Sequence, residues 1–195
     1  MLAAEGLIES HSIRTGQLTD EEWSKYAIAQ GNLAEASIYI DDTPGIRITE
    51  IRSRARKLAQ ETGNLGLILI DYLQLITGTG RENRQQEVSD ISRTLKVMAN
   101  DLGIPVIALS QLNRSVEKRD VKEPVLSDLR ESGSIEQDAD MVIFLYREGY
   151  YNEDCEEPNK TKIKFDKHRN GEVGSEFLSW LGEYTKFANW SGMRE

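Results

Sequence analysis

Residues 67–111 read LILIDYLQLITGTGRENRQQEVSDISRTLKVMANDLGIPVIALSQ, and this stretch decides the predicted fold. Short apolar runs, 67–70 and 106–109, stand near its two ends, with a polar and apolar repeat between them. Uninterrupted apolar runs are typical of strands that helices cover on both sheet faces. A strand, a helix and a second strand in this order predict a parallel βαβ unit.

The helix between the two strands has recognisable ends. Asn83 and Gln86 stand at the spacing of a capping box, and Gly103 with Pro105 is a typical stop. Apolar residues recur every three or four positions and define one buried face: Val88, Ile91, Leu95, Met98 and Leu102. We therefore predict a long amphipathic helix between the strands.

Further elements are predicted on both sides of this unit: helices over 20–30 and 48–63, and strands over 38–40, 141–146, 161–166, 176–181 and 185–190. Thr19 and Glu22 form the capping-box spacing of the first helix, and Gly31 is its expected end. The last strands follow one another closely, as in a meander. The predicted class is α/β, with a mainly parallel core and a C-terminal β-meander.

Composition limits the functions that the chain can have. Its 195 residues, 38% of them apolar, are enough for one core, so residues 1–195 are predicted to form one domain without a second. The net charge of −9 disfavours a broad basic surface that wraps nucleic acid, so any such contact must be local. Cys155 is the only cysteine, and no apolar run reaches the roughly 18 residues of a membrane span. A cytoplasmic protein is expected.

Polar residues follow both strands of the βαβ unit. Asp71 comes directly after the first strand, and Gln111 closes the stretch after the second. Open α/β sheets bind ligands at the carboxyl ends of their strands. In nucleotide hydrolases an Asp there orients Mg²⁺ and its waters, and a Gln can sense a phosphate. Either residue could equally serve only to complete hydrogen bonding at a strand end, and the local pattern leaves both readings open.

Lys167 and Arg169 flank His168 at the predicted end of a strand. Their spacing of two directs both cations to one side, and the turn Asn170-Gly171 holds them at an edge. Two aimed cations suit a phosphate group, including one bound by a neighbouring subunit. A charged, solvated strand end is the simpler alternative, and His168 is assigned no catalytic role.

The polar segment 113–140 is long for a connection inside a compact domain, and such segments are usually functional or disordered. Within it, LRESGS at 129–134 combines small residues with Arg130. Backbone amides next to small residues can approach phosphates closely, and an Arg adds a charged contact. A solvated loop explains the same composition.

Longer strings carry a more specific signal than the separate residues. The quoted stretch extended to residue 119, LSDLRESGSIEQDADMVIFLYREGYYN at 126–152, and KHRNGEVGSEFLSWLGEYTKFANW at 167–190 resemble the C-terminal ATPase domain of DnaB-type replicative helicases. Residues 13–23 and 38–63 are also similar to that family. The resemblance implies a RecA-like P-loop NTPase core, assembled as a hexameric ring that uses ATP to move 5′→3′ along single-stranded DNA and unwind duplexes.

The resemblance also implies roles for individual residues. Asp71 matches the Walker B aspartate, which holds Mg²⁺ through water, and Gln111 matches the glutamine that senses the γ-phosphate of ATP. Lys167 and Arg169 match the pair that is inserted in trans at the subunit interface. The central-channel loop that tracks the DNA backbone corresponds to Arg130, Glu131 and Gly133. Partners implied by the family are single-stranded DNA, further subunits, primase and a helicase loader.

One departure from the family pattern concerns nucleotide binding. The family's G-x-x-x-x-G-K-[ST] phosphate loop and its catalytic glutamate belong before the region where this sequence begins, and neither occurs in it. Met1 is therefore expected to be an internal position of a longer protein that supplies the P-loop unit. Without that loop the β- and γ-phosphates lose their main binding groups. The chain alone is expected to be inactive, with ATP and Mg²⁺ as cofactors of the complete protein.

Two alternatives remain at the level of sequence. The chain could be a non-catalytic assembly module that docks on intact helicase subunits and offers Lys167 and Arg169 to their nucleotide. A recombinase-like or circadian-clock ATPase on the same core is disfavoured by the strings KHRNG and LRESGSIEQDAD.

Overall fold

The computed structural model describes residues 1–78, 80, 83–152 and 154–192, with the backbone alone over 130–133. The chain forms two compact units. Unit 1 comprises Met1–Asp41, Leu145–Lys164 and Gly174–Glu195, and unit 2 comprises Asp42–Phe144 and Phe165–Val173. Both units combine segments that are distant in sequence, so the predicted single domain over 1–195 stays a prediction.

Unit 1 begins with three helices, α1 (Leu2–Gly6), α2 (Ser10–Thr15) and α3 (Asp20–Glu35). The predicted capping box is present: Thr19 Oγ1 accepts from the Glu22 N–H at 3.3 Å, and Glu22 accepts from the Thr19 N–H at 2.8 Å. The predicted end at Gly31 is wrong, because α3 runs on to Glu35. A single glycine costs a helix only about 1 kcal/mol relative to alanine, which a well-capped helix tolerates.

The strand predicted over 38–40 is also wrong. These residues have no regular secondary structure, and the side chains of Ile38, Tyr39 and Ile40 are 46%, 59% and 80% exposed. An apolar run becomes a strand only where a neighbouring strand accepts its backbone hydrogen bonds. No described strand pairs with this segment.

A four-stranded sheet has the order β3-β4-β5-β6, which is also the chain order. The predicted meander is confirmed for its last three strands, whereas β3 joins this sheet and not the parallel β1–β2 pair to which the sequence assigned it. Its strands are β3 (Met141–Arg147), β4 (Lys160–His168), β5 (Gly174–Leu181) and β6 (Lys186–Asn189). In unit 1, β5 pairs antiparallel with β6, with Trp180 opposite Phe187. The rings of these two residues lie 4.9 Å apart, so the hairpin is stabilised by a cross-strand aromatic pair.

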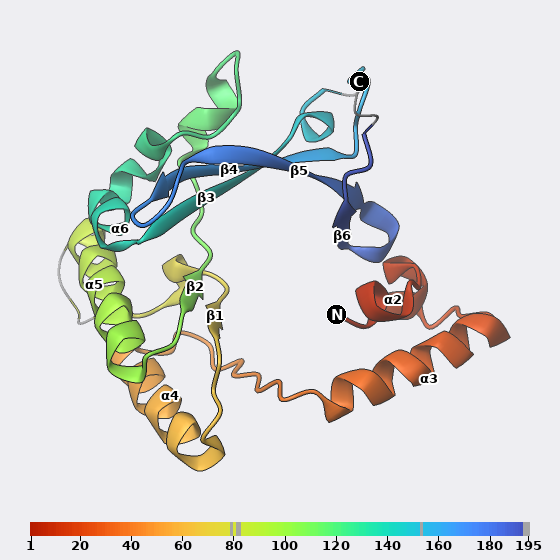
Figure 1. Cartoon of the computed structure of the whole chain (residues 1–195), viewed down its shortest axis with the longest axis horizontal. Coiled ribbons are helices and arrows are strands. Elements are labelled where there is room, and N and C mark those ends of the chain that lie inside the picture. The colour runs from red at the N-terminus through yellow and green to blue at the C-terminus, as the bar shows by residue number, and fades with distance from the viewer. Residues whose placement is uncertain (79, 81–82, 153, 193–195) are drawn as a thin grey trace. The chain divides into compact units, whose positions relative to one another are not determined.

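Unit 2 contains the predicted βαβ unit. Strands β1 (Ile68–Ile70) and β2 (Val106–Ala108) are parallel, with Ile68 opposite Val106 and Ile70 opposite Ala108. The connection between them contains the predicted long helix α5 (Arg84–Leu102), and Asn83 caps it by accepting from the Gln85 N–H at 2.9 Å. Figure 1 shows β1 and β2 next to each other with α4 and α5 on one side of the pair.

The core of unit 2 lies between these helices and strands. Helix α4 (Ile48–Thr62) ends at Gly63 as predicted, and its apolar face packs on α5. The buried members of this core are Ile48, Leu73, Ile76, Ile91, Leu95 and Met98. Alternate strand residues point the other way, where Leu69 is 61% and Ile107 is 48% exposed. The β1–β2 pair therefore has one covered and one open face, whereas the uninterrupted apolar runs predicted that both faces are covered.

The segment 113–140 is folded rather than an extended loop. It contains the 3₁₀ helices η2 (Arg114–Lys118) and η3 (Leu126–Ser132) and the helix α6 (Gly133–Asp138). Asp128 is buried, and its carboxylate accepts from Arg119 at 2.7 Å and from the Val125 N–H at 2.9 Å. The buried carboxylate thus receives from protein groups the hydrogen bonds that water would supply in a solvated loop.

Short 3₁₀ helices complete the described chain: η1 (Leu73–Leu75), η4 (Glu148–Tyr150) and η5 (Gly182–Tyr184). None of the described helices combines the length and the apolar character that crossing a membrane would require.

Candidate functional site

Asp71 and Gln111 follow the carboxyl ends of two adjacent parallel strands, as the sequence predicts. The two strand ends are joined by backbone hydrogen bonds: the Leu109 N–H donates to the Ile70 carbonyl at 2.9 Å, and the Leu73 N–H donates to the Leu109 carbonyl at 2.9 Å. Both Asp71 and Gln111 are exposed. They are therefore available to a ligand at one edge of the β1–β2 pair.

Gln74 is a residue of this edge that sequence reasoning did not identify. Its side-chain oxygen accepts from the Gln111 N–H at 3.2 Å, and its side-chain nitrogen donates to Ser110 Oγ at 3.2 Å. The Gln74 amide thus both accepts a hydrogen bond from the segment that carries Gln111 and donates one to it. Its contacts span more than thirty residues of sequence, and no local pattern could have revealed them.

A cavity of about 390 Å³ adjoins this edge in unit 2. It is lined by residues from the strand ends, the start of α5 and η3: Gln74, Asn83, Arg84, Gln85, Val88, Ser110, Gln111, Leu112, Asn113, Asp128 and Leu129. The lining is rich in amides, which can both donate and accept hydrogen bonds. The Arg84 guanidinium is held by the Gln74 carbonyl at 2.8 Å and by Glu87 at 2.9 Å.

The fit of Mg²⁺ rests on Asp71. Magnesium keeps several waters and is usually bound through one or two carboxylates together with phosphate oxygens of the substrate. A single exposed carboxylate at a strand end is compatible with that arrangement. Among the described side chains, no cluster of three or more His, Cys, Asp or Glu forms a complete metal site made of protein alone.

Lys167 and Arg169 come together at the end of β4, again as their spacing predicts, but their contacts were not foreseen. Lys167 Nζ donates to the backbone carbonyl of Glu136 and, at 3.5 Å, to that of Gln137. Arg169 also donates to the Gln137 carbonyl. Both cations thus bind the C-terminal end of α6, where helix carbonyls lack partners and positive charge is favoured. The Arg169 side chain is 44% exposed and can still be reached from outside.

The predicted DNA-contacting residues lie where η3 meets α6. The backbone changes from one helix to the other between Ser132 and Gly133. The side chains of Arg130 and Glu131 and the surroundings of Gly133 belong to the part that the structure does not describe, so the roles of these residues remain predictions.

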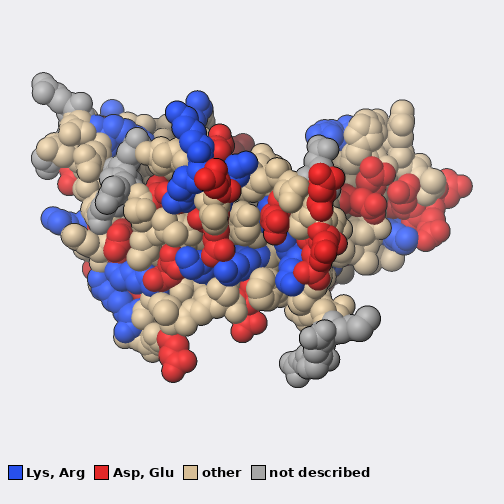
Figure 2. All heavy atoms as spheres, turned by 90° about the horizontal axis from the view of Figure 1, so that it is seen from above, with Lys and Arg blue, Asp and Glu red and all other residues tan. Residues whose placement is uncertain are grey.

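The surface carries charges of both signs. Figure 2 shows Lys and Arg side chains among Asp and Glu side chains, with acidic residues in excess over the whole sequence at 33 against 24. The prediction that any nucleic-acid contact is local follows from this same acidic excess and stays a prediction.

Known proteins similar to this chain were found by sequence. Residues 1–189 match the DnaB-like helicase C terminal domain family. The chain is 60% identical over 191 residues to the replicative DNA helicase DnaB of Geobacillus stearothermophilus, and 59% identical to the replicative DNA helicase DnaC of Bacillus subtilis (strain 168). These matches cover 97% of the chain and 42% of each relative's length.

Solved structures agree with the sequence matches. The fold superposes on a solved ATPase domain with a TM-score of 0.91 at 40% identity, covering 97% of this chain and 68% of that one. The same TM-score and identity hold for a DnaB-like replicative helicase studied with its primase interactions, of which 46% is covered. The agreement confirms the predicted α/β fold class, and the chain belongs to the DnaB-like helicase C-terminal domain family.

Proposed function

We propose that this chain is part of the ATPase domain of a replicative DNA helicase, which couples ATP hydrolysis to 5′→3′ translocation on single-stranded DNA and to duplex unwinding. Relatives that are 60% and 59% identical carry the name of replicative DNA helicases. The observation that carries the proposal is the shared edge of Asp71 and Gln111, because nucleotide hydrolysis in an open α/β sheet needs its metal and phosphate ligands there.

Four residues have proposed roles at the nucleotide. Asp71 holds Mg²⁺ through water, and Gln111 contacts the γ-phosphate of ATP. Lys167 and Arg169 meet the nucleotide of a neighbouring subunit and stabilise the charge that develops on the transferred phosphoryl group. The exposed Arg169 side chain supports this role, since an arginine that acts in trans must extend beyond the surface of its own subunit.

DNA binding is proposed for the junction of η3 and α6, through Arg130, Glu131 and Gly133. A loop that supplies a few contacts per subunit suits a chain with a net charge of −9. The proposed assembly is a hexameric ring in the cytoplasm that works with a helicase loader and a primase. One of the similar solved structures concerns a DnaB-like helicase and its interactions with primase, which supports the last of these partners.

The proposal is tested by ATP hydrolysis and unwinding. The full-length protein that contains these residues should hydrolyse ATP with single-stranded DNA present, and Asp71→Asn should lower kcat by about a hundredfold or more because Mg²⁺ loses its protein anchor. The 195-residue chain alone should show no turnover, since it contains no G-x-x-x-x-G-K-[ST] sequence. Turnover by the chain alone, or an Asp71→Asn protein of normal activity, would contradict the proposal.

An assembly module is the second candidate, and the exposed Arg169 side chain favours it as well. Such a module would dock on intact helicase subunits and present Lys167 and Arg169 to their nucleotide. Mixing the chain with an intact helicase should then change its ATPase rate, and the change should vanish with Arg169→Ala. An unchanged rate on mixing contradicts the module.

A further inference from the structure

Asp140 makes three contacts: two fix the start of the β4–β5 turn to the residue before β3, and the third binds α5. Its carboxylate accepts from Arg169 Nη1 at 3.3 Å, and its backbone carbonyl accepts from the Arg169 N–H at 2.9 Å. The other carboxylate oxygen accepts from Lys96 Nζ of α5. Arg169 is thus held by main chain and side chain of one residue, and that residue is held by a helix of the core.

The charge state of Asp140 suits this arrangement. The hydrogen bond from Lys96 is the main cause that lowers the pKa of the Asp140 carboxyl, and the charges of Lys96, Arg169 and Lys167 lower it further. Asp140 is therefore ionised at neutral pH, and it attracts the Arg169 guanidinium as a full negative charge. Its side chain is 51% exposed, so this attraction is screened and an incoming phosphate can compete with it.

Helix α6 connects the same contacts to the proposed DNA-binding junction. It begins at Gly133, and near that end Ser134 Oγ donates to Ser89 Oγ of α5 at 2.8 Å. Its last carbonyls receive the hydrogen bonds of Lys167 and Arg169. The helix has six residues, so its two ends are only about one and a half turns apart, and a change at one end lies close to the other.

We propose that Asp140 is a positioning residue for Arg169: it keeps the guanidinium at the C-terminal end of α6 until a phosphate of a neighbouring subunit takes its place. This inference rests on the proposed function of Arg169. When a phosphate binds the guanidinium, the Gln137 carbonyl loses one of its two donors, and Lys167 is the cation that stays bound at the end of α6. Asp140 keeps its contact with Lys96, so its carboxylate stays in place and binds Arg169 again when the phosphate leaves.

The activity test uses Asp140→Asn in the full-length protein. The asparagine keeps the size and loses the charge, so Arg169 is held less firmly. We expect kcat of ATP hydrolysis with single-stranded DNA to fall on the order of tenfold, with KM changed less than about twofold, because the ATP-binding groups of each subunit are untouched. Asp140→Glu, which restores the charge, should recover part of the loss.

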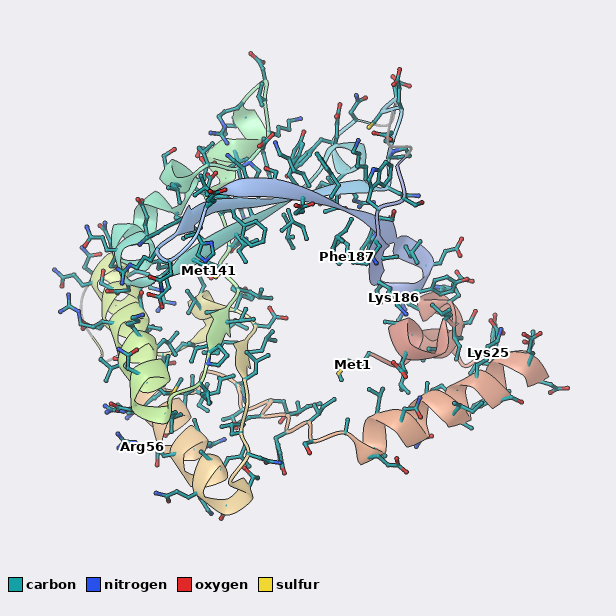
Figure 3. All side chains as sticks on the ribbon, viewed as in Figure 1. Met1, Lys25, Arg56, Met141, Lys186 and Phe187 are labelled. Carbon is teal, nitrogen blue, oxygen red and sulfur yellow. The ribbon has the colours of Figure 1, made fainter. Side chains whose placement is uncertain are left out.

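Asp101→Asn is the matched control. Asp101 lies at the end of α5, and its carboxylate accepts from Arg52 at 2.7 Å and Arg56 at 2.9 Å. Its substitution therefore weakens arginine contacts, as that of Asp140 does. Arg56 projects from α4 away from β1 and β2 (Figure 3). The control should keep the wild-type kcat. Equal losses in both variants, an unchanged kcat in Asp140→Asn, or no recovery with Asp140→Glu would overturn the proposal.

Hydrogen exchange separates this inference from the proposed function. In the 195-residue chain, Asp140→Asn should speed amide exchange over 134–140, and Asp101→Asn should leave it unchanged. Unchanged exchange in Asp140→Asn would overturn the positioning role even if the full-length protein is an active helicase. If the wild-type full-length protein hydrolyses no ATP, the proposed function fails, and the exchange measurement still decides whether Asp140 holds Arg169 on α6.

Discussion

The side chain of Gln74 is bonded to the backbone of Gln111 in both directions: its oxygen accepts from the Gln111 N–H at 3.2 Å, and its nitrogen donates to the Gln111 carbonyl at 3.4 Å. A glutamine that follows β1 thereby fixes the segment that follows β2. The orientation of the Gln111 side chain depends on this backbone, so Gln74 contributes to the phosphate-sensing role proposed for Gln111.

Gln74→Ala should weaken that role without unfolding unit 2. Each neutral hydrogen bond contributes about 1 kcal/mol, so we expect a loss of several-fold in kcat for ATP hydrolysis by the full-length protein. Gln74→Glu keeps an acceptor for the Gln111 N–H and should retain more activity than the alanine variant. Steady-state kinetics on both variants check this, and equal activity of Gln74→Ala and wild type would contradict it.

The buried apolar face of α5 should make the largest contribution to the stability of unit 2. Met98 has no exposed surface, and Met98→Ala should lower the free energy of unfolding by about 2–5 kcal/mol. The adjacent Val97 is 40% exposed, so Val97→Ala should change the free energy by less than about 0.5 kcal/mol. Urea denaturation of the 195-residue chain measures both, and similar midpoints for the two variants would show that the core is elsewhere.

The cap of α3 offers a test in unit 1. Thr19→Ala removes the acceptor for the Glu22 N–H and should cost about 1 kcal/mol of stability, seen as faster amide exchange in the first turn of α3. Thr19→Ser keeps the hydroxyl and serves as the control. If serine and alanine behave alike, the hydroxyl does not act as the cap.

Asp101 gives a prediction with a defined pH dependence. Hydrogen bonding from Arg52, with a smaller contribution from Arg56, lowers the pKa of the Asp101 carboxyl in the folded chain. A carboxyl with a lowered folded pKa adds stability above its unfolded pKa of about 4, and this stability is lost as the pH falls through the folded pKa. The difference in unfolding midpoint between wild type and Asp101→Asn should therefore be present at pH 7 and shrink below about pH 4. A difference that grows on acidification would contradict this assignment.

The sequence was sufficient where local pattern and tertiary packing agree. The repeat that became α5 and the glycine at the end of α4 satisfy both, because an amphipathic helix leaves a periodic pattern and glycine is a common helix end. The apolar runs correctly predicted β1 and β2 as strands, but they also predicted two covered faces, and one face is open. The edge that joins Asp71 and Gln111 followed from the parallel order of those two strands alone.

The sequence was insufficient where distant contacts decide the outcome. The run Ile38–Ile40 resembles a strand, yet no described strand pairs with it, and Gly31 resembles a stop, yet α3 continues past it. The charge pattern at Lys167 and Arg169 predicted a common direction. It could not show that α6, about thirty residues earlier, supplies their acceptors.

The β1–β2 pair has only three residues in each strand, and two short strands are marginal in water without further support. Their support comes from α4 and α5 on a single face, so the placement of Asp71 and Gln111 is only as robust as the helices behind them. Heat-sensitive variants should accordingly map to buried core side chains such as Ile91 and Met98. Warming should abolish ligand binding at this edge before the rest of the chain unfolds.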